Sequence, residues 1–161
     1  IGVGNYGFFL YNRGCGFNLI KGHPNSLGPN KKPLHTLSPT IWSKDGSLDF
    51  ITGTRGGRYQ PQLLAQTILP YILEESSFEE IMKKPRWTIE YFGSDTSSNI
   101  KFEFIEEPEV SSLENKGHKI SIENKLIAGY GPISTIYKNS DGNFVGVPDV
   151  RVGTEKAFNN S

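Results

Sequence analysis

The sequence predicts a soluble globular domain of the α+β class. Two Asp-Gly turns, at 45–46 and 141–142, each lie between short runs rich in β-branched and aromatic residues, which is the pattern of an antiparallel hairpin. Between the hairpins, residues 61–74 carry apolar side chains at three- and four-residue spacing, which predicts a helix. A chain of 161 residues can bury a core without a disulfide or metal, and we expect one domain over residues 1–161.

The first half of the chain is expected to hold a strand, a long loop and a hairpin. Residues 7–11 are apolar and aromatic, which is typical of a buried strand. Residues 13–38 are rich in Gly, Pro, Asn and Lys without any period, which predicts a long ordered loop, and such loops are usually functional. Hairpin strands follow at 40–43 and 48–52, and a glycine-rich loop at 53–60 leads into the helix.

The second half is expected to alternate short helices and strands. The helix at 61–74 begins at Pro61, which suits a first helical turn, and Pro70 is expected to kink it or end it early. Ser77 and Glu80 form a capping-box pattern ahead of a second short helix. The remaining pattern predicts, in order, a strand at 101–105, a helix at 107–116 capped by Gly117, a strand at 119–123, and a hairpin over 133–138 and 144–147.

The charge balance argues against nucleic-acid binding. The chain has 17 Lys+Arg and 17 Asp+Glu, whereas proteins that neutralise phosphates normally carry a basic excess. Its apolar runs are too short for a membrane-spanning helix. The single cysteine, Cys15, excludes an intrachain disulfide and favours a reducing compartment. These observations leave the location open but favour the cytoplasm, and we expect binding to neither nucleic acid nor membrane.

Motifs for metals, phosphates and serine nucleophiles are missing from the sequence. His23, His35 and His118 have no cysteine or carboxylate at the spacing of a metal site, so neither a metal nor another cofactor is expected. Neither a Gly-Lys-Ser/Thr phosphate loop nor a Gly-x-Ser-x-Gly elbow occurs.

The sharpest local feature is Gly56-Gly57, placed just ahead of the predicted helix. The two backbone N–H groups can stabilise a developing negative charge beside the positive helix end, or the pair can simply form a strand-to-helix turn that needs positive φ. Arg55 and Arg58 flank the pair, and Arg13 is another of the five arginines. Such side chains bind an anionic group of a substrate, or they are solvated or paired with the chain's own acidic residues.

Eight separated segments form a recognisable series. They are Phe9–Phe17, His23–Asn25, Pro29–Thr40, Lys44–Gly46, Gly53–Gly57, Pro85-Arg86, Gly117-His118 and Asp149–Gly153. Their order and spacing resemble the C-terminal, small-subunit part of the γ-glutamyltranspeptidase family over almost the whole chain. The Asn-Arg-Gly and Tyr-Gln-Pro-Gln variants look most like the transpeptidase-like and cephalosporin-acylase-like branch.

This resemblance implies an N-terminal-nucleophile hydrolase, a four-layer αββα sandwich, of which this chain is a part without the first strands and the large subunit. In that family an autocatalytic cut exposes a threonine, whose hydroxyl attacks an amide while its α-amine acts as base. That threonine is expected upstream of Phe9–Phe17, and Ile1 has no hydroxyl, so no nucleophile is expected in this chain and the chain alone is expected to be inactive. Gly56 and Gly57 match the family's oxyanion hole.

The resemblance also implies the substrate contacts. His35 and Thr36 stand where the transpeptidases have paired serines that bind the substrate's carboxylate. Asn12 and Arg13 belong to the loop that holds the α-amine in those enzymes, and Gly16 replaces its aspartate. Because an arginine repels an ammonium group, Arg13 favours an acyl group without the amine, such as glutaryl.

Two functions stay open at this point. The chain is part of a γ-glutamyltransferase-like amidohydrolase or acyltransferase that acts on γ-glutamyl or glutaryl-type amides. Alternatively, it is a non-catalytic binding or oligomerisation domain derived from that scaffold. The implied partners are a small-molecule amide and either the large subunit or a second copy of the chain.

Overall fold

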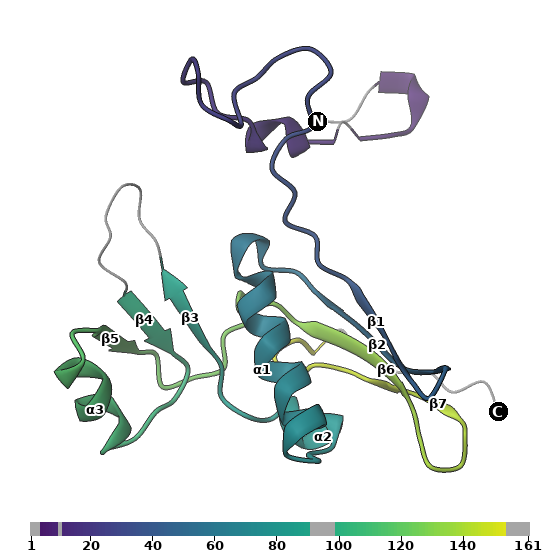
Figure 1. Cartoon of the computed structure of the whole chain (residues 1–161), viewed down its shortest axis with the longest axis vertical. Helices are drawn as coiled ribbons and strands as arrows, with labels where there is room; N and C mark the ends of the chain where they lie inside the picture. The colour runs from purple at the N-terminus through teal and green to yellow at the C-terminus, as the bar shows by residue number, and fades with distance from the viewer. Residues whose placement is uncertain (1–3, 10, 91–98, 154–161) are drawn as a thin grey trace. The chain divides into compact units, whose positions relative to one another are not determined.

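The computed structural model describes residues 4–9, 11–90 and 99–153 (Figure 1). Ile1 and Leu10, which the sequence analysis used, lie outside these residues. The chain divides into two compact units, Ile1–Thr36 and Leu37–Ser161, and each is described by itself. That residues 1–161 act as one domain stays a prediction.

The first unit is built from turns. It contains two short 3-10 helices, η1 at Gly4–Tyr6 and η2 at Arg13–Gly16. The strand expected at 7–11 is wrong for the residues described, 7–9 and 11, which form no continuous strand and leave Phe9 82% exposed. An apolar run becomes a strand only where a neighbouring strand pairs its backbone, and sequence pattern alone does not reveal that neighbour.

The long loop expected at 13–38 is confirmed and is ordered by polar contacts. Asn18 and Ser26 form an isolated bridge between its two arms. The Lys31 ammonium group donates to the carbonyls of Pro24 and Ser26 at 3.0 and 3.1 Å. These contacts close the loop without an apolar core.

The second unit contains a four-stranded antiparallel sheet in the order β1-β2-β6-β7. Its strands are Thr40–Lys44, Ser47–Thr54, Ile133–Lys138 and Phe144–Val147. Both expected hairpins are confirmed. In the first turn, Asp45 and Gly46 have φ of 51° and 75°, the two positive values that a tight hairpin with right-handed strand twist requires.

Two helices cover one face of this sheet, α1 at Gln60–Leu73 and α2 at Phe78–Ile81 (Figure 1). The expected capping box is confirmed, because the Ser77 and Glu80 side chains accept from each other's backbone N–H groups. Pro70 does not end α1, which continues to Leu73. A proline removes a single hydrogen bond, and the packing of the helix's apolar face outweighs that loss.

The core lies between this sheet and these helices. It consists of Phe50, Leu63, Leu64, Ile68, Phe78, Ile81, Met82, Tyr130, Ile133 and Val147. Phe50 stacks edge-on against Tyr71 and Phe78, with ring centroids 5.1 and 5.2 Å away. Aromatic pairs in this geometry add to the stability gained from burial alone.

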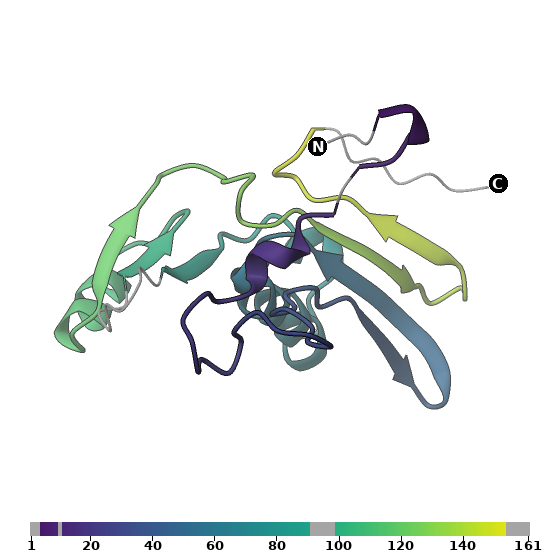
Figure 2. The same ribbon diagram turned by 90° about the horizontal axis from the view of Figure 1, so that it is seen from above.

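A three-stranded sheet in the order β3-β4-β5 lies on the other side of α1 (Figures 1 and 2). Its strands are Trp87–Glu90, Asn99–Phe102 and Lys119–Ile122, and α3 at Glu109–Asn115 connects the parallel pair β4 and β5. The α+β class is therefore confirmed. None of the helices that the structure describes is long and apolar enough to cross a membrane.

Strand β3 was not predicted from the sequence. Two glutamines of α1 bind its backbone: Gln66 accepts from the Trp87 N–H and Gln62 accepts from the Ile89 N–H, both at 3.0 Å. The outer edge of β3 is thus satisfied by side chains instead of a fourth strand, a pairing that no local pattern indicates.

Candidate functional site

The Gly56-Gly57 loop connects β2 to a 3-10 turn, η3 at Gly57–Tyr59, and so to α1. Gly56 has φ of 132° and Gly57 has φ of 56°. Among the residues that the structure describes, neither glycine's N–H donates to an acceptor, while the Gly56 carbonyl accepts from the Tyr59 N–H at 3.0 Å. Two unused donors therefore lie at the helix end where the backbone dipole favours negative charge. That they form an oxyanion hole stays a prediction.

A third glycine, which the sequence analysis missed, packs behind this loop. A Cβ on Gly131 would lie 2.0 Å from the Arg55 carbonyl oxygen and 2.3 Å from the Thr54 hydroxyl, so no side chain fits there. The Thr54 hydroxyl in turn donates to the Arg55 carbonyl at 2.8 Å. In the sequence, Gly131 lies in a Gly-Tyr-Gly-Pro run that looks like an ordinary loop.

Four charged side chains are buried together beneath this region: Arg86, Glu103, Asp149 and Arg151, none more than 8% exposed. Arg86 pairs with Asp149 at 2.6 Å, and Arg151 pairs with Glu103 and, at 3.3 Å, with Asp149. The four formal charges sum to zero. The sequence series contained three of these residues without indicating their burial, because charged residues are by default expected at the surface.

Asp149 lies at the centre of the buried cluster, where it contacts both arginines. Burial in itself raises its pKa, but the Arg86 guanidinium and the N–H groups of Ile133 and Arg151 outweigh burial, and the pKa lies below its usual value. Asp149 therefore stays charged in the folded protein at neutral pH.

In the first unit, the structure joins two predicted site residues that are 23 positions apart. Arg13 donates from Nη1 to the Thr36 hydroxyl at 2.9 Å. The same guanidinium lies 5.7 Å from the centre of the Tyr11 ring, and its Nε and Nη2 are 3.4 Å from the Tyr11 hydroxyl. Asn12 and His35 are exposed beside them in the chain, and Arg55 is exposed in the second unit.

Packing within the loop favours a glycine at position 16. A Cβ at this position would lie 3.1 Å from the Leu34 carbonyl oxygen, tighter than an ordinary contact. The Asn25 amide also donates to the Gly16 carbonyl. The loop thus closes tightly where the transpeptidases are expected to carry an acid.

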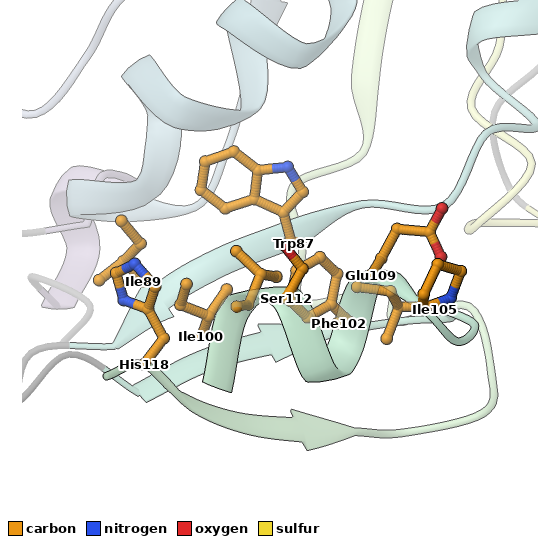
Figure 3. A pocket seen from close by; sticks show the side chains of 10 residues that line it. Trp87, Ile89, Ile100, Phe102, Ile105, Glu109, Ser112 and His118 are labelled. Atoms are coloured by element: carbon orange, nitrogen blue, oxygen red, sulfur yellow. The ribbon is translucent and has the colours of Figure 1, made fainter. Parts of the chain in front are cut away.

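A separate apolar groove of about 720 Å³ lies between the three-stranded sheet and α3 (Figure 3). It is lined by Trp87, Ile89, Ile100, Phe102, Ile105, Pro108, Glu109, Ser112, Leu113 and His118. No residue that the sequence analysis assigned to a site lines it. Across the described ranges, no group of three or more His, Cys, Asp or Glu is arranged to hold a metal ion.

Comparisons with known proteins agree on one family. A family model described as gamma-glutamyltranspeptidase matches residues 1–158. The oxamate amidohydrolase proenzyme of Klebsiella pneumoniae is 29% identical over 146 residues, which cover 90% of this chain and 28% of that protein. The chain therefore spans less than a third of the length of this relative.

Two solved structures extend the similarity to the fold. The γ-glutamyltranspeptidase T380A mutant of Helicobacter pylori matches with a TM-score of 0.77 and 22% identity, covering 94% of this chain and 86% of that one. The cephalosporin acylase of Bacillus halodurans matches with a TM-score of 0.73 and 26% identity, covering 88% of this chain and 26% of that one. With the family match spanning both units, these similarities show that the chain belongs to the γ-glutamyltranspeptidase family, whose fold is that of the N-terminal-nucleophile hydrolases.

Proposed function

We propose that this chain is the part of a γ-glutamyltransferase-like amidohydrolase or acyltransferase that stabilises the oxyanion and holds the acyl group of the substrate. The attacking threonine is supplied by the remaining portion of the enzyme, since the chain corresponds to 28% of a proenzyme relative. The hydroxyl adds to the amide carbonyl, the carbonyl oxygen becomes an oxyanion, and collapse expels the amine and leaves an ester with the threonine. Water or another amine then releases the acyl group.

The observation that carries this proposal is the conformation of Gly56-Gly57. Positive φ at both residues and unused N–H groups in the turn just ahead of a 14-residue helix suit a negative oxygen. Removing one such donor from an acyl-transfer site costs about 10²–10³ in kcat. A strand-to-helix turn without a ligand role would also require positive φ, but it would not require the N–H groups of Gly56 and Gly57 to lack acceptors.

The acyl group is proposed to be anionic at its far end and to lack an α-amine. The Arg13 guanidinium, held by Thr36, offers its remaining N–H groups to a carboxylate. An ammonium at the same place meets a like charge, at a cost of roughly 1–3 kcal/mol or about ten- to a hundredfold in discrimination. Glutaryl amides are therefore the preferred donors over γ-glutamyl amides.

The proposal is tested by co-expressing the chain with the upstream portion of its proenzyme and assaying glutaryl and γ-glutamyl p-nitroanilides. We expect turnover by the combined protein, none by the chain alone, and a higher kcat/KM for the glutaryl donor. Arg13→Gln narrows the ratio of the two kcat/KM values, whereas Lys21→Gln, which removes an exposed cation from the same unit, leaves it unchanged. Absence of turnover with both donors contradicts the catalytic proposal, and an unchanged ratio in Arg13→Gln contradicts the placement of Arg13.

A partner is proposed for the face of the four-stranded sheet opposite α1. Ile41 is paired with Ile51, Ile51 is paired with Ile136, and all three side chains are at least 36% exposed. Phe144, 54% exposed, comes from β7, the strand beyond β6. A row of isoleucines across three strands is typical of a surface that another layer covers, either the large subunit or a second copy of the chain.

This surface also supports the alternative of an oligomerisation domain. Light scattering of the chain at tens of micromolar should show association that Ile51→Lys reduces. Leu73→Lys, which places the same charge at an exposed apolar position on α1, is the control. A strict monomer for the unmodified chain would contradict the partner surface.

A further inference from the structure

We propose that Arg86 is a positioning residue that holds the Gly56-Gly57 loop in its donor geometry. This inference rests on the proposed function, because the value of that geometry is the stabilisation of an oxyanion. Arg86 touches neither glycine and acts through the segment 130–133.

The Arg86 guanidinium donates hydrogen bonds to two backbone carbonyl groups of this segment. Its Nη1 donates to the carbonyl of Tyr130 at 3.2 Å and to that of Gly131 at 2.9 Å. The Asp149 carboxylate binds the same segment by accepting a hydrogen bond from the Ile133 N–H at 2.8 Å. Because Arg86 and Asp149 also pair with each other at 2.6 Å, the two side chains and the segment form a closed ring of contacts.

The segment transmits this constraint to the loop. Gly131 leaves no room for a Cβ against the Arg55 carbonyl, so the two backbones are in direct contact. The Thr54 hydroxyl lies 3.3 Å from the Pro132 carbonyl and donates to the Arg55 carbonyl at 2.8 Å. Displacing 130–133 therefore displaces the carbonyl of Arg55, whose peptide plane also carries the N–H of Gly56.

The chemistry of arginine explains why this residue is charged and buried. Two carbonyls and a carboxylate need a planar cation with several donors in fixed directions, which a lysine ammonium does not provide. Arg151 is the natural comparison, because it is equally buried but donates to the carbonyls of Met82 and Lys84, away from the loop. A purely structural role for the cluster predicts the same functional effect from both arginines.

The experiment compares Arg86→Lys with Arg151→Lys in the combined protein. The readouts are the urea midpoint, kcat and KM for the preferred anilide, and the amide exchange rate of Tyr59, whose N–H binds the Gly56 carbonyl. We expect both variants to lose stability. Arg86→Lys alone should accelerate Tyr59 exchange and lower kcat about tenfold or more with KM within about twofold.

Equal changes in kcat and in Tyr59 exchange for the two variants would overturn the proposal. If the unmodified protein turns over neither anilide, the proposed function fails, while Tyr59 exchange still decides whether Arg86 positions the loop. If the lysine variants do not fold, the same two readouts, kcat and Tyr59 exchange, are compared in two neutral double variants. These are Arg86→Met/Asp149→Asn and Arg151→Met/Glu103→Gln.

Discussion

The two regions that carry predicted site residues are built in opposite ways. Around Gly56-Gly57, the chain is fixed by a glycine with no room for a side chain and by four buried charges. Around Arg13, a single contact to Thr36 and a tyrosine ring hold a half-exposed side chain. A substitution at Gly131 disturbs packed atoms in the first region, whereas Arg13 and Thr36 in the second region can change at little cost to the fold.

This difference matches the two proposed tasks. Stabilising an oxyanion requires donors held in place before the reaction, since their value depends on orientation. Choosing between acyl groups requires only that a side chain complementary in charge to the acyl group be available. Substitutions in the two regions should therefore separate effects on stability from effects on substrate preference.

The largest effect is expected from Gly131→Ala. Its Cβ overlaps the Arg55 carbonyl oxygen, and its φ of 51° is unfavourable for alanine, so the free energy of unfolding should fall by roughly 3–6 kcal/mol. Urea denaturation measures the change. Gly142→Ala is the control, because it has φ of 85° but its nearest atom is 3.8 Å away, and about 1 kcal/mol is expected. Equal losses in the two variants would show that Gly131 is not sterically special.

Asp149→Asn should lower the free energy of unfolding by about 3 kcal/mol at pH 7, because Arg86 keeps its buried charge without a full partner. The pKa of Asp149 is lowered in the folded state, so its stabilisation is present above about pH 4 and is lost as the pH falls through the folded pKa. Urea midpoints from pH 6 to pH 3 should fall less steeply in the variant. Asp141→Asn, at an exposed turn position, should leave the pH profile as it is.

The smallest effect on stability is expected from Thr36→Val, which removes the hydroxyl that binds Arg13 and keeps the branched shape. The free energy of unfolding should change by about 0.5–1.5 kcal/mol. The ratio of kcat/KM for glutaryl and γ-glutamyl donors should nevertheless shift, since Arg13 loses its orientation. Thr36→Ser retains the hydroxyl and should retain the ratio. A large loss of stability in Thr36→Val would contradict the contrast between the two regions.

Local chemistry predicted most of the regular elements. The Asp-Gly hairpins, the capping box at Ser77 and the helix after the glycine-rich loop depend on neighbouring residues, which the sequence displays directly. The strand at 7–11 failed and β3 was missed because each depends on what lies beside it in space. In β3 the neighbours are strand β4 on one edge and two glutamine side chains from α1 on the other.

The sequence singled out only some of the residues that form the candidate site, and their roles stay predictions. Gly56-Gly57 stood out because two adjacent glycines ahead of a helix give the backbone unusual freedom, whereas Arg13 was assigned through the resemblance to the family. Gly131 and Glu103 did not, since a glycine between loop residues and a glutamate near a strand end look ordinary. Their roles arise from contacts to Arg55 and Arg151, which are 76 and 48 positions away.

The buried cluster of Arg86, Glu103, Asp149 and Arg151 also determines when the second unit can fold during synthesis. Arg86 and Glu103 leave the ribosome well before Asp149 and Arg151, and until those residues arrive each charge lacks a partner that its folded position requires. Burying an unpaired charge is strongly unfavourable, so the second unit cannot bury this cluster before Asp149 and Arg151 have been made. Folding of the second unit therefore requires the chain through residue 151, although most of its sheet and helices precede that residue.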